Sequence, residues 1–561
     1  MAFQPQGAIQ VQHRPVAALC AVIALLTAAC SGAAAVTEDP EGAGATGTPV
    51  QKTRQQSSRL LGGDGSPPRW EMAPAWARHP ELLQGSERFQ RLARKRAPEP
   101  GERTNVVLIT TDDMTASELR WMPKTRALVG GAGVRFSDSL APHPLCCPAR
   151  AMTLTGQFAH NNGVRTNTWP TGGYYKLDHA NTLPVWMKAA GYETAMVGKY
   201  LNEYAMRDPD EVPPGWDHWR APARYGVYDY YNYRLNVDGD LRQVRGTYQT
   251  DYYTEESEQL IRQMSSDDQP FFLWQSHLAP HTGCPVVGAG DGCWRYPTPS
   301  TDYADAFDHT TPPQLDDPSY DERDVSDKPA KIARQAPLTR QERHHYTELF
   351  QRRIESLRSV DDGVARTLAT LQEVGELDNT LVIFTSDNGY LLGEHRTAGK
   401  NLGYEPSLRV PLLMRGPSVP AGVRRDATVG TVDLAPTIAA AGGATPGLRV
   451  DGRNLLPVAG GAKPGWETIL IQAGPRGKRR SGWTFRGVRT DRYTYMERRA
   501  TDEAELYDRR RDPFQLHNVA GEPAYARTEA ELRRRLLRLQ DCAGAQCRQT
   551  FGPVPAPRPV R

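Results

Sequence analysis

A short segment near residue 150 combines a thiol, a proline and an arginine in an arrangement suited to anion chemistry. Residues 146–150 read Cys-Cys-Pro-Ala-Arg, and Leu-Thr-Gly follows at 154–156. Pro148 fits the first turn of a helix, which predicts that Cys146 lies just before a helix N-terminus, where backbone N–H groups favour an anion. Arg150 adds a planar, permanently charged group that binds tetrahedral oxyanions. The segment indicates a nucleophile beside an anion site; the alternative is a buried pair of thiols at an ordinary helix start.

Two apolar runs of β-forming residues, at 105–110 and 380–385, each lead into side chains suited to a cation. These side chains are Asp112, Asp113, Asp387 and Asn388. Continuous apolar runs predict strands buried on both faces of a parallel sheet, and such sheets bind ligands at their carboxyl edge. Four oxygen ligands at one edge favour Ca²⁺ or Mg²⁺ over zinc. The alternatives are a solvated loop or helix cap after the first run and an Asn-Gly turn after the second.

The segment at 146–156 resembles the signature of the sulfatase family, Cys-x-Pro-Ser/Ala-Arg followed by Leu-Thr-Gly, and the similarity extends over residues 103–522. In this family the first cysteine is oxidised to Cα-formylglycine. The resemblance therefore implies this modification at Cys146, with a formylglycine-generating enzyme as the maturation partner. Ala149 replaces the more usual serine, while the Cys-x-Pro-x-Arg pattern for maturation is kept.

The same resemblance implies a role for each of the polar residues. The implied ligands of one Ca²⁺ ion are Asp112, Asp113, Cys146 (as formylglycine), Asp387 and Asn388. The implied catalytic residues are Cys146, Arg150, Lys199, His281 and Lys400. The two lysines match sulfate-binding lysines, and the histidine of Ala-Pro-His matches one that binds sulfate and can protonate the leaving group. His277 is the alternative to His281, and Leu201 stands where many sulfatases carry a histidine.

The resemblance implies hydrolysis of a sulfate ester to an alcohol and sulfate through the hydrated formylglycine. Residues 198–204, 214–216 and 231–233 look most like N-acetylglucosamine-6-sulfatases and heparan-sulfate sulfatases, which implies a substrate such as 6-O-sulfated N-acetylglucosamine. An aryl sulfate is the alternative substrate. A phosphate or phosphonate ester hydrolase of the same superfamily, a catalytically inactive binding lipoprotein and a disulfide-linked cell-surface protein are the alternative hypotheses. The net charge of +3 and the lack of a nucleic-acid motif do not suggest a nucleic-acid partner.

The remaining elements must bring these residues together, and their pattern is that of an α/β protein. Runs at 192–197 and 271–274 predict two more buried strands. A Thr-x-x-Glu capping box at 339–342 opens a helix whose apolar residues recur every three or four positions up to residue 371. A helix followed by a strand is the unit of a doubly wound α/β fold. With the family resemblance, this predicts an alkaline-phosphatase-like α/β fold with a large, mostly parallel sheet flanked by helices and a smaller antiparallel C-terminal sheet.

The chain divides into four expected segments. Residues 1–30 hold an apolar run too short to span a membrane, followed by Leu-Thr-Ala-Ala-Cys, which resembles a bacterial lipobox with Cys30 as the lipidated residue. Plain secretion is the alternative, and in both cases we expect an exported, extracellular or cell-surface protein. Residues 31–100 are polar and rich in glycine and proline, which predicts a linker. We expect the catalytic domain at 101–465 and the C-terminal subdomain at 466–552.

Four further cysteines form two closely spaced pairs, Cys284 with Cys293 and Cys542 with Cys547. In an exported protein we predict a disulfide in each pair. Four free thiols and metal ligation are the alternatives, although no Cys/His spacing matches a zinc site. Residues 478–480, Lys-Arg-Arg, lie in a glycine-rich loop. We interpret them as solvated, with a polyanion subsite as the alternative.

Overall fold

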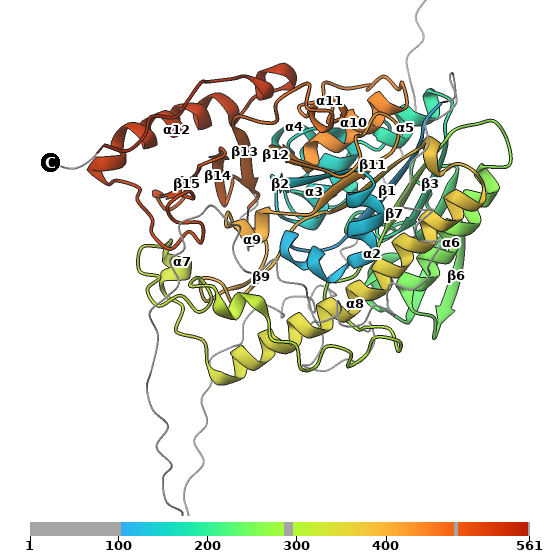
Figure 1. The fold of residues 1–561 in the computed structure, drawn as a ribbon, viewed down its shortest axis with the longest axis horizontal. Helices are drawn as coiled ribbons and strands as arrows, with labels where there is room; N and C mark the ends of the chain where they lie inside the picture. The colour runs from blue at the N-terminus through green and yellow to red at the C-terminus, as the bar shows by residue number, and fades with distance from the viewer. Residues whose placement is uncertain (1–102, 285–295, 476–480, 559–561) are drawn as a thin grey trace, which may run out of the picture. The chain divides into compact units, whose positions relative to one another are not determined.

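A ten-stranded sheet lies at the centre of the computed structural model, which describes residues 103–284, 296–475 and 481–558 (Figure 1). The strands lie in the order β12-β2-β11-β8-β1-β7-β3-β4-β5-β6. Their bounds are β1 Asn105–Thr111, β2 Val134–Leu140, β3 Glu193–Gly198, β4 His218–Pro222, β5 Asn232–Val237, β6 Asp240–Arg245, β7 Phe271–Ser276, β8 Thr380–Ser386, β11 Leu412–Arg415 and β12 Val423–Gly430. The five strands from β8 to β4 are parallel, whereas β11 and β5 pair with antiparallel neighbours. The predicted large, mostly parallel sheet is confirmed.

The register of the four central strands aligns their carboxyl ends. Thr111, the last residue of β1, pairs with Ser386 of β8. Ser276, the last residue of β7, pairs with Thr110 of β1 and with Gly198 of β3. Because these strands are parallel, the loops that follow all four of them leave the sheet at one edge. The site residues predicted after these four strands are therefore brought to the same edge of the sheet.

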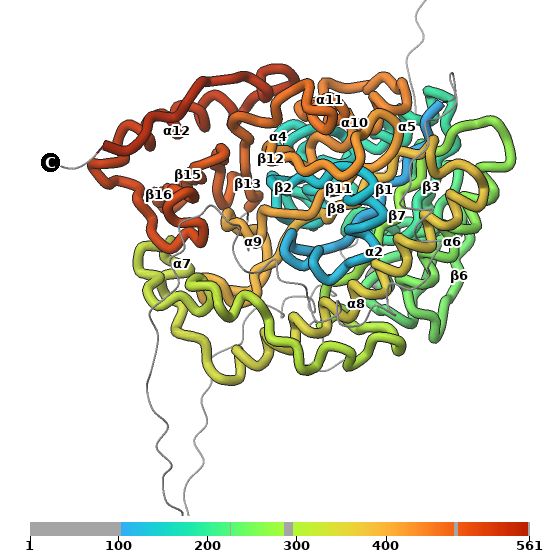
Figure 2. Tube along the Cα trace, viewed as in Figure 1, coloured from blue at the N-terminus to red at the C-terminus, as the bar shows by residue number. Residues whose placement is uncertain are grey.

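Helices cover both faces of this sheet. Their bounds are α2 Pro123–Thr125, α3 Cys146–Thr155, α4 Ala159–Asn162, α5 Leu183–Ala189, α6 Gln249–Met264, α7 Ala330–Ala333, α8 Arg340–Glu373, α9 Glu405–Leu408, α10 Leu434–Ala441, α11 Leu456–Ala459 and α12 Ala526–Leu539. Val107 of β1 packs in a core with residues of α6 and α8, which run side by side (Figure 2). Val106 packs in a second core with residues of α3, α5 and α10. Successive residues of β1 thus point into the two cores, as in a strand buried on both faces.

Helix α8 confirms the long helix predicted from the capping box. The Thr339 hydroxyl accepts a hydrogen bond from the backbone N–H of Glu342 at 3.2 Å, and the Glu342 carboxylate accepts one from the backbone N–H of Thr339 at 2.7 Å. The residues that it buries against the sheet include Leu357, Val360 and Val364, at the predicted helical spacing. The helix is followed by a short turn and then by β8, so the predicted helix–strand unit is present.

A smaller antiparallel sheet follows, in the order β13-β14-β15-β16. Its strands are β13 Ile469–Ala473, β14 Phe485–Arg489, β15 Tyr493–Arg498 and β16 Glu503–Asp508, and α12 packs against β14 and β15. A disulfide joins Cys542 to Cys547 after α12, with a Cα–Cα distance of 5.1 Å, which confirms one of the two predicted bridges. A small antiparallel pair of two-residue strands, β9 Leu391–Leu392 and β10 Ala398–Gly399, lies between β8 and β11 in the chain.

Several predictions concern residues outside the described ranges. They are the export signal with Cys30, the linker at 31–100, Cys293 as partner of Cys284, and the basic run at 478–480. Within the described part of the chain, every helix is too short or too polar to span a bilayer.

Candidate active site

Acidic and amide side chains gather where β1 and β8 end. Asp112, Asp113, Asp387 and Asn388 are all buried. The backbone N–H of Asp113 donates to Asp387 Oδ1 at 3.1 Å, and the side-chain amide of Asn388 donates to Asp113 Oδ1 at 2.6 Å. Asp113 has φ +71°, in the left-handed region, which turns the chain so that both aspartates face this cluster. The structure therefore brings the two predicted acidic segments together.

Cys146 lies against the same cluster. Its Sγ is 3.4 Å from Asp112 Oδ1 and accepts a hydrogen bond from Lys400 Nζ at 2.7 Å. Helix α3 begins at Cys146, with Leu145 as the N-cap, so Cys146 is the first helical residue and does not precede the helix as predicted. Pro148 permits this start because the first N–H groups of a helix have no partner within it.

Three cationic side chains surround the thiol and the aspartates. Arg150 donates from Nε to Asp387 Oδ2 at 2.8 Å, and from its NH1 nitrogen to Ser276 Oγ at 2.7 Å. The ammonium of Lys199 contacts Asp112, and that of Lys400 contacts Asp113. Burial alone would lower the pKa of these lysines, but the neighbouring aspartates raise it above its usual value, so both ammonium groups remain charged.

The structure distinguishes the two candidate histidines. His281 Nδ1 lies 2.7 Å from the carbonyl oxygen of Thr282, which can only accept, so Nδ1 donates and Nε2 faces Asp113 Oδ2 at 3.7 Å. Neither ring nitrogen of His277 has a hydrogen-bond partner among the described residues, and its ring lies 6.4 Å from that of Tyr253. His281 is therefore the histidine of this cluster. Potential ligand atoms of Asp112, Asp113, Cys146 and His281 lie within 4.8 Å of one another.

The missing histidine at position 201 also has a structural explanation. Leu201 is buried in the apolar core that contains Trp219 and Trp274. A polar side chain in this core would lose its hydration without gaining a hydrogen-bond partner, so the position favours an apolar side chain. Leu201 therefore lies outside the cluster around Cys146. All nine residues predicted for the site lie in that cluster.

The donor set fits a hard cation. Burial and the neighbouring Asp112 together raise the pKa of Asp387 to about 6, against the opposing effect of Arg150. Asn388 Oδ1 is buried and has no hydrogen-bond partner in the described structure. Crowded carboxylates and an unpaired amide oxygen are the oxygen donors that Ca²⁺ takes in proteins. Asp112, Asp113, Asp387 and Asn388 are therefore suited to hold Ca²⁺.

The electrostatics at Cys146 disfavour the thiolate. Burial raises the pKa of the Cys146 thiol far above its ordinary value, and the Asp112 carboxylate raises it further. The thiolate is the nucleophilic form of cysteine, so the thiol itself is a weak nucleophile here. Burial would also raise the pKa of Asp112, but Lys199 and the other nearby cations lower it well below its usual value, which keeps that carboxylate ionised. The Cys146 thiol is therefore held in its protonated form beside an ionised carboxylate.

Two features of the site were not predicted from the sequence. The Tyr228 ring lies 5.1 Å from Lys199 Nζ and 5.3 Å from the His281 ring, so it forms an aromatic wall beside both residues. Arg353 of α8 donates to both carboxylate oxygens of Glu118, at 2.6 and 2.7 Å, and to the carbonyl oxygen of Asp113 at 2.6 Å. Removing one partner of such a buried pair typically costs about 3–5 kcal/mol, so this pair holds the left-handed Asp113 turn in place.

The chain is similar to known proteins over most of its length. The Sulfatase family model matches residues 104–444, and a model described as N-sulphoglucosamine sulphohydrolase, C-terminal, matches residues 393–542. An arylsulfatase of Volvox carteri is 34% identical over 497 residues, which cover 80% of this chain and 76% of the relative. The N-acetylglucosamine-6-sulfatase of Capra hircus is 30% identical over 498 residues, which cover 81% of this chain and 86% of the relative.

The fold is also shared with solved structures. A protein solved in complex with its substrate D-glucosamine-2-N,6-O-disulfate superposes with a TM-score of 0.64 at 24% identity, covering 78% of this chain and 98% of that one. The predicted alkaline-phosphatase-like fold is thereby confirmed. With the match to the family model over more than half of its length, the chain belongs to the sulfatase family.

Proposed function

We propose that this sulfatase hydrolyses a sulfate ester on a sugar, such as 6-O-sulfated N-acetylglucosamine, using a formylglycine made from Cys146. The observation that carries the proposal is the contact of Cys146 Sγ with both Asp112 and Lys400, at 3.4 and 2.7 Å, in a buried cluster of three cations and four oxygen donors. The sugar substrate is supported by the similarity to N-acetylglucosamine-6-sulfatase and to the C-terminal model named for a sulphoglucosamine sulphohydrolase.

Two groups are expected to complete the site. A hydrated formylglycine at position 146 supplies an oxygen nucleophile and a second hydroxyl through which sulfate is released. Ca²⁺, held by Asp112, Asp113, Asp387 and Asn388, supplies positive charge for the sulfuryl oxygens. The buried thiol of Cys146 is a weak nucleophile in this environment, so the proposal assigns the attack to an oxygen of the formylglycine.

The chain's own residues orient and neutralise the sulfuryl group. Arg150 is fixed by Asp387 and Ser276, so its guanidinium is already oriented before substrate binds. The ammonium of Lys199 contacts Asp112 and that of Lys400 contacts Asp113, so both are placed to stabilise negative charge on the sulfuryl oxygens. Preorganised donors of this kind contribute about 10²–10³-fold each to turnover.

Proton transfer to the leaving alcohol is assigned to His281 and Lys400, which both contact the cluster. His281 presents Nε2 toward Asp113, while its Nδ1–H is held by the carbonyl oxygen of Thr282, so His281 can give a proton from Nε2 only as the imidazolium. Lys400 Nζ is the second group within reach of the atoms at position 146. The ring of Tyr228 lies beside both His281 and Lys199, and it limits how the alcohol part of the substrate can lie.

The reaction class is tested by comparing matched aryl sulfate and aryl phosphate esters with purified, matured protein. We expect kcat/KM for the sulfate to exceed that for the phosphate by at least about tenfold, a ratio within the reach of differential transition-state binding. The Cys146→Ala protein is the control for contaminating hydrolases. Faster hydrolysis of the phosphate would instead favour the phosphate or phosphonate hydrolase hypothesis. A second panel of sugars sulfated at O6 or at other positions then tests the proposed substrate, and activity restricted to aryl sulfates would exclude it.

A further inference from the structure

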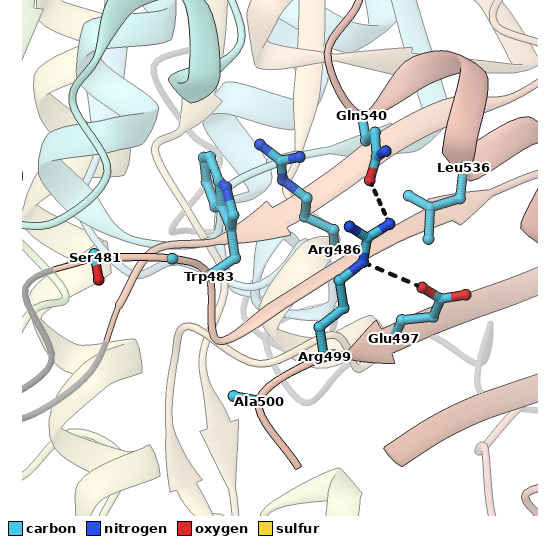
Figure 3. A pocket seen from close by; sticks show the side chains of 9 residues that line it. Ser481, Trp483, Arg486, Glu497, Arg499, Ala500, Leu536 and Gln540 are labelled. Atoms are coloured by element: carbon cyan, nitrogen blue, oxygen red, sulfur yellow. Dashed lines mark hydrogen bonds and ion pairs between the residues drawn. The ribbon is translucent and has the colours of Figure 1, made fainter. Parts of the chain in front are cut away.

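A pocket of about 290 Å³ lies on the small C-terminal sheet (Figure 3). Its walls come from the loop before β14, from β14 and β15, from the turn after β15, and from the end of α12. The lining residues on which its chemistry depends are Trp483, Arg486, Glu497, Arg499, Leu536 and Gln540. None of these residues belongs to the cluster around Cys146. A volume close to about 300 Å³ is at the lower end of small-molecule sites and suits a single ring-sized group.

An aromatic ring and a guanidinium form one wall of this pocket. The guanidinium carbon of Arg486 lies 4.4 Å from the centroid of the Trp483 ring, and Figure 3 shows the two side chains side by side. Arg165, from outside the small sheet, lies 5.5 Å from the same ring and donates to the carbonyl oxygen of Gly482 at 3.3 Å. These contacts hold the Trp483 loop and place two positive charges next to an indole.

Positive charge exceeds negative charge at Arg486. It donates to Asp541 at 3.0 Å, but the Asp541 side chain is 72% exposed, so solvent weakens that interaction. Arg486 Nε is buried and has no hydrogen-bond partner in the described ranges. Burial lowers the pKa of Arg486, and the nearby Arg499 and Arg165 lower it further against the opposing effect of Asp541. An anion beside Arg486 would offset this repulsion and satisfy the buried donor.

Arg499 supplies the facing wall. Its guanidinium donates to Gln540 Oε1 at 3.0 Å and lies 3.7 Å from Glu497 Oε2 (Figure 3). Glu497 is shared with Arg533, which donates to it at 2.9 Å, so this single carboxylate does not neutralise both arginines. The Arg499 side chain is 63% exposed, and it is therefore accessible to a ligand from solvent.

The pocket is close in space to the catalytic segment, although it is far from it in the sequence. The Trp483 ring lies 6.3 Å from the ring of His143, which is three residues before Cys146. Three residues span at most roughly 11 Å, so Trp483 lies on the order of 20 Å or less from Cys146. The backbone N–H of Gln472, in the small sheet, also donates to the carbonyl oxygen of Pro142 at 2.9 Å. An oligosaccharide can bridge such a distance, whereas a single sugar cannot.

We propose that this pocket is an accessory subsite for an anionic sugar residue, carrying a carboxylate or a sulfate, of the same oligosaccharide whose sulfate ester reaches Cys146. Arginine binds both anions through its planar fork of donors, and the indole offers an apolar surface to a sugar ring. The inference rests on the proposed function, because it takes the substrate to be a sulfated sugar chain. It adds that the enzyme selects for chain length and for a second negative charge.

The test compares two substrates of different length. These are N-acetylglucosamine 6-sulfate and a heparan-derived tetrasaccharide with a 6-O-sulfated glucosamine at its non-reducing end and uronic acids further along. In the Arg486→Gln/Arg499→Gln double variant, the ratio of kcat/KM for the tetrasaccharide to that for the monosaccharide is expected to fall about tenfold, through KM, because charge-assisted hydrogen bonds are lost. Arg499→Gln alone is expected to lower the same ratio. Because Arg499 is exposed, this single variant still tests the subsite if the double variant fails to fold.

The matched control removes the same charge elsewhere on the subdomain. Arg510 is 64% exposed, pairs with Asp491 and does not line the pocket, so Arg510→Gln should leave the ratio at the wild-type value. A wild-type ratio in the pocket variants would overturn the subsite, and so would an equal effect of the control. Calorimetric binding of the tetrasaccharide to Cys146→Ala protein, with and without the Arg499→Gln change, separates the two proposals. Unchanged affinity rejects the subsite even if the sugar is hydrolysed, and weakened affinity supports the subsite even if hydrolysis of the sugar fails.

Discussion

Replacing Cys146 with alanine is expected to abolish sulfate ester hydrolysis, with kcat/KM on an aryl sulfate falling by at least about 10⁴-fold. Removal of a catalytic nucleophile has effects of this size in other hydrolases. Cys146 is buried against Asp112 and Lys400, and no other side chain of the cluster can form the oxygen nucleophile that the proposal places at this position. The measurement is steady-state hydrolysis by protein produced together with a formylglycine-generating enzyme.

Cys147 provides the matched control, since it is the adjacent residue and equally buried. Its side chain packs in the apolar core with Ala151 and Leu154, away from the acidic cluster, while its backbone N–H donates to Asn167 at 3.0 Å. Cys147→Ala keeps this backbone contact and should retain activity close to the wild type, with at most a modest loss of stability. Wild-type turnover by Cys146→Ala, or equal losses in the two variants, would contradict the assignment.

The second large effect is expected for Asp387→Asn. This change removes one negative charge from the four oxygen donors and weakens the 2.8 Å contact that orients Arg150. Both losses weaken the stabilisation of the negative charge that develops on the sulfuryl oxygens in the transition state. We therefore expect kcat/KM to fall by about 10³-fold. We also expect less than one bound calcium per chain after dialysis, measured by elemental analysis, and partial recovery of activity at high calcium concentration.

Asp433 is a suitable control for this experiment. It is fully buried, and burial raises its pKa to about 6, as burial does for Asp387. It accepts hydrogen bonds from the backbone N–H of Gly430 and from the indole of Trp466, outside the acidic cluster. Asp433→Asn should therefore change stability but keep the calcium content. Full calcium occupancy in Asp387→Asn would show that the cation site lies elsewhere.

The central part of the fold and the proximity of the nine predicted site residues were predictable because their signals are local or belong to a motif. Apolar runs identified β1, β3, β7 and β8, and polar residues directly followed them. Parallel strands end at a common edge, so proximity of Asp112 and Asp387 followed from topology without knowledge of any contact. The capping box at Thr339 likewise fixed the start of α8 from four residues. The choice of His281 over His277 came from the resemblance, and the geometry at Asp113 supports it.

The remaining features depend on contacts between distant residues, which leave no local pattern. Arg353 and Glu118 are 235 positions apart, and in the sequence each has the pattern of an ordinary charged residue at the surface. Strand β6 is almost entirely exposed, so it lacks the apolar run that identifies buried strands.

The accessory pocket shows the same limitation. Arg486 of β14 lies opposite Glu497 of β15, and Arg499 follows two positions later. Only the pairing register places these side chains together, and a register is poorly specified by sequence in short strands with many polar residues.

The most direct measurement of the central claim relates activity to the chemical state of residue 146. Protein is produced with graded amounts of a formylglycine-generating enzyme, and peptide mass spectrometry gives the fraction of chains that carry the aldehyde at that position. Specific activity on an aryl sulfate is predicted to rise in proportion to this fraction and to vanish when it is zero. Activity that is independent of the aldehyde fraction, or full activity in protein with an intact Cys146 thiol, would contradict the proposed mechanism.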